Sequence, residues 1–191
     1  IFPSYNALQI QDILRERAEK SFQAGVVQVG VVEKCAAYSA RDHGDVRRAI
    51  DLLRIAGEIA ERSGSSAVEI KHLDEAEKKI EVDKIIDAAA NQPKQFQSVL
   101  YAILLLFPQK KNFFTGEIYD VYKNICRQTK LNVLTQRRIS DMLAELDMLG
   151  IINAKIISKG RYGRTRDVSL SLDENLILKL KAILEKSLQL T

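Results

Sequence analysis

The chain has 191 residues, enough for one large domain or two small ones, and its 46% hydrophobic and 28% charged residues are typical of a soluble globular protein. Its two cysteines, Cys35 and Cys126, are too few for a disulfide framework or a four-ligand zinc site. Residues 1–90 hold 13 Lys and Arg against 16 Asp and Glu, a net charge of −3, whereas residues 91–191 hold 16 against 9, a net charge of +7. This asymmetry favours an anionic partner for the rear half.

No segment of the sequence predicts a membrane span. The longest apolar run, residues 99–107, is far shorter than the roughly 20 residues that cross a bilayer, and no signal peptide is visible. We therefore expect a cytoplasmic protein without a membrane partner. Because the chain opens with Ile1-Phe2-Pro3 rather than with methionine, we also expect it to be a piece of a longer protein.

The first 90 residues predict an all-helical domain. Apolar residues recur every three to four positions over four segments, which is the spacing of amphipathic helices. Glycines or polar loops separate the segments, and no residue pattern within them indicates catalysis. The four segments are residues 5–22, 29–41, 46–61 and 72–90.

Two arginines stand at the start of the third of these helices, directly after Gly44 and Asp45. Because the helix macrodipole mildly disfavours cations in the first turn, we expect an anionic neighbour for Arg47 and Arg48. That neighbour is either an external anion or a nearby acid of the same domain. The nearby acids are Asp42, Asp45 and Asp51.

Residues 91–191 predict the element order of a winged helix-turn-helix: helix, strand, helix, helix, strand, wing, strand, helix. Strands are expected over residues 112–114, 151–157 and 167–172. Three helices are expected over residues 93–107, 136–149 and 173–188. A further helix is expected to begin after an N-cap at Thr115 and to end at a turn over residues 130–134. The third helix, capped by Thr135 and with Leu149 on its inward stripe, is the natural reader of DNA. Its candidate contacts are Thr135, Gln136, Arg137, Arg138 and Ser140.

The wing is strongly cationic. Residues 155–166 hold five Lys and Arg and no acid, and two glycines bracket a tyrosine at the tip. Such a hairpin suits contact with a phosphate backbone or a groove of DNA. Its candidate contacts are Lys159, Gly160, Arg161, Tyr162, Gly163 and Arg164. The sequence leaves open which arginine reads a base, and whether Tyr162 lies against a sugar or props the wing.

Three segments carry a resemblance to a known family. GDVRRAIDLLRIAGEIA, residues 44–60, resembles the second sensor helix in the lid of AAA+ ATPases, in the form found in archaeal replication initiators of the origin-recognition and cell-division-control type. FPSYNALQIQDILRERAEKSF, residues 2–22, resembles the passage from the nucleotide-binding core into that lid. NQPKQFQSVLYAIL, residues 91–104, resembles the start of the family's winged helix.

The resemblance implies a mainly α protein with a helical AAA+ lid at residues 1–90 and a winged-helix DNA-binding domain at residues 91–191. It implies that Arg47, with Arg48 as its companion, senses the nucleotide of the missing core. Because the chain has no G-x-x-x-x-G-K-[ST] loop, we expect no catalysis by this piece, and ATP or ADP with Mg only in the full-length protein. The implied partners are double-stranded origin DNA, other initiator copies and the replicative helicase. The resemblance also implies that the protein is associated with the nucleoid.

Two other hypotheses remain open from the residues themselves. A winged-helix transcription regulator, with a front half that dimerises or binds a ligand, would prefer a palindromic promoter. Part of an ATPase that acts on protein or RNA would prefer those partners to duplex DNA.

Overall fold

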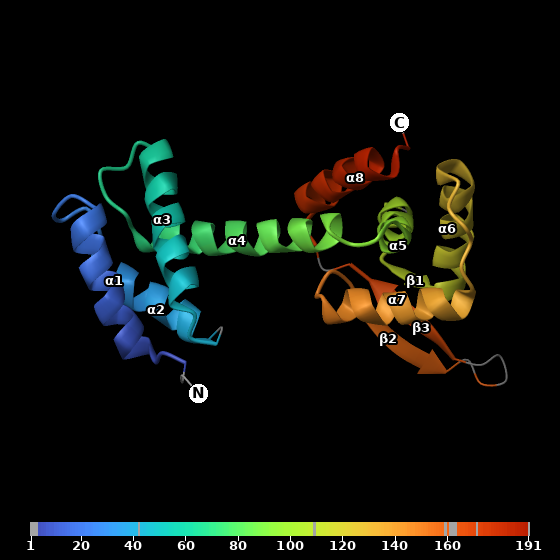
Figure 1. The fold of residues 1–191 in the computed structure, drawn as a ribbon, viewed down its shortest axis with the longest axis horizontal. Helices are drawn as coiled ribbons and strands as arrows, with labels where there is room; N and C mark the ends of the chain where they lie inside the picture. The colour runs from blue at the N-terminus through green and yellow to red at the C-terminus, as the bar shows by residue number, and fades with distance from the viewer. Residues whose placement is uncertain are drawn as a thin grey trace. The chain divides into compact units, whose positions relative to one another are not determined.

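The computed structural model describes residues 4–41, 43–108, 110–158, 160, 164–170 and 172–190, and the chain divides into two compact units, Ile1–Glu81 and Val82–Thr191 (Figure 1). The division falls within helix α4, Ile70–Ala90, which ends at the last residue of the predicted lid domain. The predicted mainly α class with a small hairpin is confirmed. No helix among the described residues is long and apolar enough to cross a membrane.

The first unit consists of helices packed around one core, as the apolar spacing predicts. Leu14 of α1, Cys35 of α2 and Leu52 of α3 are fully buried, and Leu73 and Ala76 of α4 belong to the same core. Within the described residues the unit contains an isolated parallel bridge between Val27 and Val68 and no longer strand. Its helices are α1 Ala7–Ser21, α2 Val31–Arg41, α3 Val46–Arg62 and the beginning of α4.

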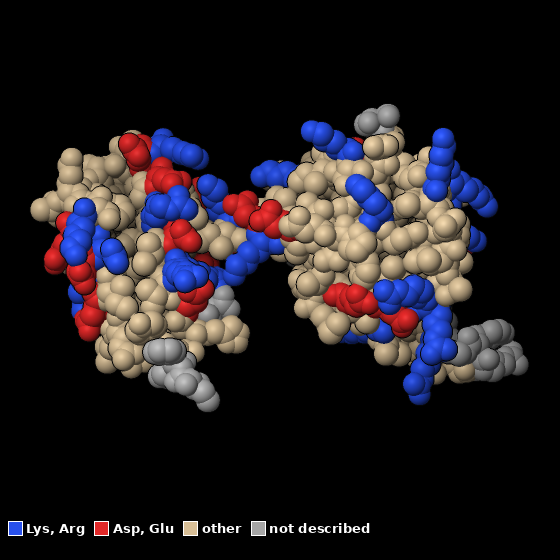
Figure 2. Space-filling view, viewed as in Figure 1, with Lys and Arg blue, Asp and Glu red and all other residues tan. Residues whose placement is uncertain are grey.

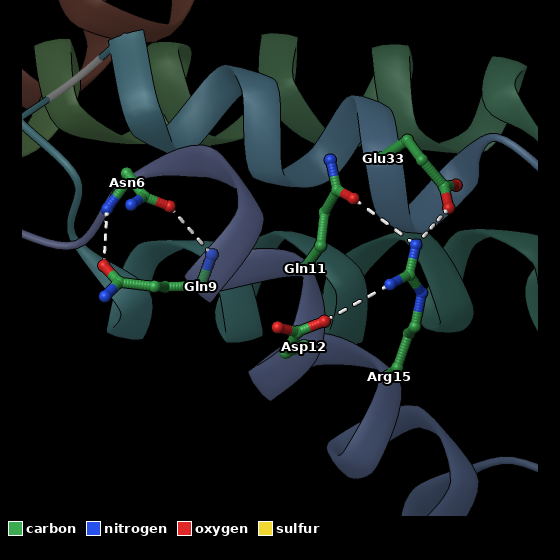
Figure 3. Close-up of polar contacts among 6 residues, drawn as sticks. All are labelled: Asn6, Gln9, Gln11, Asp12, Arg15 and Glu33. Carbon is green, nitrogen blue, oxygen red and sulfur yellow. Dashed lines mark hydrogen bonds and ion pairs between the residues drawn. The ribbon is translucent and has the colours of Figure 1, made fainter.

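Polar side chains define how the first helix starts and what it contacts (Figure 3). Asn6 and Gln9 form a capping box, in which each side-chain oxygen accepts from the other residue's backbone N–H at 3.0 Å. Six residues beyond Gln9, the guanidinium of Arg15 lies 2.9 Å from Glu33 at the start of α2. These bonds fix the beginning of α1 and join α1 to α2.

The second unit is built around α5, whose residues Phe96 to Leu104 are all buried. Helices α6, α7 and α8 pack against α5 or against one another, and a three-stranded antiparallel sheet with strand order β1-β3-β2 completes the unit (Figure 1). Val168 of β3 lies opposite Phe113 of β1 and Ala154 of β2. The elements are α5 Lys94–Leu106, β1 Asn112–Phe114, α6 Thr115–Thr129, α7 Gln136–Met148, β2 Asn153–Ser158, β3 Arg164–Ser169 and α8 Glu174–Leu188.

The strands of the hairpin are shifted by up to three residues from their expected bounds, to 153–158 and 164–169. Two side-chain expectations were also wrong. Thr115 is the first residue of α6 rather than its N-cap, because β1 runs directly into the helix and Phe114 occupies the cap position. Leu149 is 44% exposed rather than inward, because α7 ends at Met148 and the chain turns at Gly150 with φ 70°. The predicted cap at Thr135 is confirmed, since its side chain accepts from the N–H of Arg138.

Candidate nucleic-acid interface

The turn that leads into α7 is held by a buried tyrosine. Tyr122 of α6 is fully buried, and its hydroxyl donates to Gln95 Oε1 at 2.5 Å and accepts from the N–H of Leu134 at 3.1 Å. Burial raises the pKa of Tyr122 to about 12. Gln95 also donates to the carbonyl of Asn132, and Tyr119 donates to that of Leu134. The start of α7 is therefore positioned by hydrogen bonds from α5 and α6.

A groove of about 890 Å³ lies between the beginning of α6, the beginning of α7 and the β2–β3 hairpin. Three of its side chains are arginines, one from α7 and two from β3. Its lining residues are Phe114, Thr115, Gly116, Glu117 and Asp120 of the α6 region, Gln136, Arg137 and Ser140 of α7, and Ile156, Arg164, Thr165 and Arg166 of the hairpin.

The two acids of the groove already have cationic partners. Glu117 pairs with Lys110 and accepts from the backbone N–H of Phe114 at 2.8 Å. Asp120 lies 2.9 Å from Lys123. On the face shown in Figure 2, the first unit carries side chains of both signs, whereas Lys and Arg predominate on the second unit. An anion in the groove would therefore meet an excess of positive charge.

The structure separates the two neighbouring arginines of α7. Arg137 and Gln136 line the groove, and within the described residues Arg137 has no ion-pair partner. Arg138 instead lies 3.3 Å from Glu145 and 6.0 Å from the ring centre of Phe96. This separation follows from helix geometry, because adjacent residues point about 100° apart.

The strands of the wing are described, whereas most of its tip is not. Arg164 is exposed, lines the groove and, in the described part of the chain, has no ion-pair partner. Gly160 has φ 60°, a left-handed conformation that suits glycine at a turn. The other predicted tip contacts, Lys159, Arg161, Tyr162 and Gly163, lie outside the described residues.

Arg166 joins the wing to both helices of the groove, a role that was not predicted. Its Nε donates to the carbonyl of Ser140 at 2.9 Å and to the Ser140 hydroxyl at 3.2 Å. Its backbone N–H donates to the hydroxyl of Thr115 at 3.1 Å. Strand alternation could have indicated that Arg166 faces the body of the unit, because it is two residues from buried Val168 and shares its face of the strand. The predicted contact Ser140 is thus bonded to the wing.

Exposed Ile156 was also missed. It lies opposite Arg166 in the hairpin, lines the groove and is 61% exposed. A single exposed apolar side chain is common on protein surfaces, so sequence alone gives no reason to select it.

The first unit places Arg47 and Arg48 in different environments. Arg47 is exposed at the start of α3 and, among the described residues, has no side-chain partner. Arg48 is 13% exposed and lies 2.8 Å from Glu77 of α4, which is 8% exposed. Among the described residues, Glu77 is thus an internal acid that pairs with Arg48, and it was not among the acids considered from the sequence. Asp42, one of the acids considered, lies outside the described residues.

The residues before these arginines determine where α3 begins. Gly44 has φ 70°, and a Cβ there would overlap the backbone carbonyl of Tyr5. Asp45 then accepts from the N–H of Arg47 at 2.9 Å as the N-cap of α3. The Gly-Asp pair thus sets the helix start and places Arg47 at its exposed N-terminal edge.

A helix-turn-helix packed on a small sheet with a hairpin defines the second unit as a winged helix, preceded here by a helical unit. Residues 11–78 match the "Cdc6 AAA+ ATPase-type lid domain" and residues 87–180 match "CDC6, C terminal winged helix domain". The chain therefore belongs to the Cdc6 and ORC1-type family of archaeal replication initiators, and it comprises the lid and the winged helix. The resemblance seen in the sequence is confirmed.

Relatives and a solved structure agree with this assignment. The chain is 53% identical over 173 residues to the ORC1-type DNA replication protein of Pyrococcus horikoshii, covering 90% of this chain and 41% of that protein. It is 48% identical over 179 residues to ORC1-type DNA replication protein 1 of Archaeoglobus fulgidus, covering 94% and 44%. The structure of the Aeropyrum pernix ORC1 protein in complex with DNA is similar over 97% of this chain and 48% of its own, with a TM-score of 0.77 and 43% identity. The chain thus spans less than half the length of these relatives.

Proposed function

We propose that this chain binds double-stranded DNA at replication origins, as the C-terminal part of an archaeal replication initiator. The observation that carries the proposal is the cationic groove between the start of α7 and the β2–β3 hairpin. In winged-helix proteins a recognition helix occupies the major groove and its N-terminal residues contact the bases. With the hairpin in the adjacent groove, the sugar–phosphate strand between them would lie along the groove of the protein.

Arg137 and Arg164 are the cations that we assign to DNA contact within the described residues. Both line the groove, one from the helix and one from the wing. Each phosphate that a Lys or Arg neutralises steepens the log–log dependence of affinity on salt by about 0.9. If Arg137 instead forms a bidentate bond to guanine, the contact would contribute about 1–3 kcal/mol of discrimination. Arg138 would contribute less to DNA binding, because it pairs with Glu145.

The remaining predicted contacts complete the proposed interface. Gln136 would meet base edges beside Arg137, and Thr135 and Ser140 would act chiefly through the placement of α7. The tip residues Lys159, Gly160, Arg161, Tyr162 and Gly163 would follow the minor groove or its phosphates. The structure of Aeropyrum pernix ORC1 was solved in complex with DNA, which supports a DNA-binding role for this similar chain.

In the full-length protein, we propose that the lid reports the nucleotide state of an AAA+ core that binds ATP or ADP with Mg. Arg47 is suited to reach a phosphate because it is exposed at the helix start. Arg48 would support it by holding α3 against α4 through Glu77. Other initiator copies and the replicative helicase are the proposed protein partners, and origin binding would place the protein at the nucleoid.

The proposal is tested by titrating the chain against a fluorescent duplex from the intergenic DNA of its own replicon, at several salt concentrations. A scrambled duplex of equal length and an RNA duplex serve as competitors. We expect Arg137→Ala combined with Arg164→Ala to weaken binding and to reduce the salt slope by about 1.8, since two phosphate contacts are removed.

The matched control is Lys179→Ala, which removes an exposed cation of α8 that does not line the groove. It should leave affinity and salt slope nearly unchanged. Equal losses in the control and the double variant would contradict the assignment of the groove. A preference for RNA, or equal affinity for the scrambled duplex, would contradict the binding of origin DNA.

A further inference from the structure

We propose that Arg166 is a positioning residue: it fixes the wing to the recognition helix α7, so that Arg137 and Arg164 meet DNA at a set spacing. The inference rests on the proposed DNA binding. The location of Arg166 in a cationic run would otherwise suggest one more phosphate contact. Its hydrogen bonds indicate a different main role.

Arg166 bonds to two elements of the unit's body at once. Its Nε donates to the backbone carbonyl and the hydroxyl of Ser140 in the second turn of α7. Its backbone N–H donates to the hydroxyl of Thr115, which is 4% exposed at the start of α6. A bond from a charged donor is shorter and stronger than one between neutral groups, so the Ser140 contact is a firm one.

The position of Arg166 along β3 gives these bonds their effect. Strand β1 pairs with β3 as far as Phe114, which lies opposite Asp167. The next backbone N–H of β3 belongs to Arg166, and the Thr115 hydroxyl accepts it where β1 has become helix. Beyond this point, the described residues Arg164 and Thr165 pair only with β2. A two-stranded ribbon has little stability by itself, so its direction depends on the residue at its base.

A wing of fixed direction and a fixed recognition helix can engage neighbouring grooves together. We call the side-chain bonds from Arg166 to Ser140 the anchor. If the anchor is lost, the two-stranded ribbon loses its fixed direction and must be ordered each time DNA binds. Ordering one or two further residues would weaken binding by about tenfold. The effect on DNA would thus arise through Arg137 and Arg164 rather than through a bond from Arg166 itself.

Two substitutions separate the anchor from the charge. In Arg166→Gln the amide nitrogen is as many bonds from the backbone as Nε, so a donor to Ser140 is kept and the charge is lost. In Arg166→Lys the charge is kept, but a methylene replaces Nε and the donor is lost. Both variants are measured by duplex titration at several salt concentrations and by hydrogen exchange of the β2 and β3 amides in the DNA-free protein.

The anchor predicts that Arg166→Lys binds about tenfold more weakly and exchanges its hairpin amides faster, since the ribbon is then free at its base. It predicts that Arg166→Gln keeps slow exchange and loses less than about fivefold in affinity, the effect of one screened charge. Near-normal binding by Arg166→Lys, with weaker binding and a smaller salt slope for Arg166→Gln, would identify a plain phosphate contact and overturn the inference.

Equal losses in the two variants, or unchanged exchange in both, would also overturn it. Thermal unfolding of each variant shows whether the unit still folds. If Arg166→Lys does not fold, hydrogen exchange in Ser140→Ala, which removes one of the two oxygens that accept from Arg166 Nε, tests the side-chain anchor. Because exchange is measured without DNA, a failure of wild-type DNA binding would reject the proposed function and still leave the anchor testable.

Discussion

Gly44 and Gly64 have nearly the same backbone conformation and very different surroundings. Their φ angles are 70° and 69°. A Cβ at Gly44 would overlap the Tyr5 carbonyl and lie 3.2 Å from Ser4, whereas a Cβ at Gly64 would meet nothing within 4 Å. The first position thus combines a conformational and a steric requirement, and the second has the conformational one alone.

A left-handed backbone costs a residue with a Cβ about 1–2 kcal/mol. We expect Gly44→Ala to lower the free energy of unfolding by more than this amount. Gly64→Ala should cost only that amount, so it is the matched control. Urea unfolding followed by circular dichroism measures both. Equal losses would mean that the backbone of Tyr5 moves aside freely and that Gly44 serves only as a turn residue.

At the scale of elements, the position of α7 depends on side chains of α5 and α6. Tyr122 and Gln95 hold the turn at residues 130–134 from inside the unit, and Arg166 and Ser140 tie the wing to the same helix. The turn before α7 is thus bonded to α5 and α6, and the second turn of α7 is bonded to β3. These bonds support the beginning of α7, where Gln136 and Arg137 line the groove.

We expect Tyr122→Phe to lower the free energy of unfolding by about 1–3 kcal/mol, because the N–H of Leu134 and the Gln95 oxygen lose their partner. Duplex affinity should fall as well, since the turn sets the start of α7. Tyr119→Phe is the control: it removes a single bond to the half-buried carbonyl of Leu134, which water can replace. Unfolding and duplex titration measure both variants. Equal effects would show that the buried hydroxyl of Tyr122 stabilises the turn no more than the hydroxyl of Tyr119 does.

At the scale of the whole molecule, the element proposed to face a nucleotide and the element proposed to face DNA belong to different units. The exposed N-terminal edge of α3 is in the first unit, and the cationic groove is in the second. The two are assigned to different ligands, so they should be separable by mutation.

We expect Arg47→Ala to leave duplex binding by this chain unchanged and to lower ATP turnover in the full-length protein on the order of a hundredfold, the usual loss when one preorganised charge is removed from a reacting phosphate. Arg62→Ala, an exposed arginine in the last turn of the same helix, is the control. Steady-state phosphate release measures turnover. Normal turnover in Arg47→Ala would remove its nucleotide-sensing role.

The sequence by itself determined the element order, the cap at Thr135, the cationic wing and the family. These follow from periodicity, capping chemistry and motifs, which are local properties of the chain. It failed at Thr115, because local capping preference could not foresee that β1 passes straight into α6.

Only the tertiary structure decided how charges and hydroxyls are shared between elements. Glu77 pairs with Arg48 from 29 residues away, and Arg166 reaches Ser140 from 26 residues away. Arg137 faces the groove while its neighbour Arg138 turns to Glu145. Hydrogen bonds and ion pairs act over a few ångströms, so partners distant in sequence are known only once packing has brought their helices and strands together.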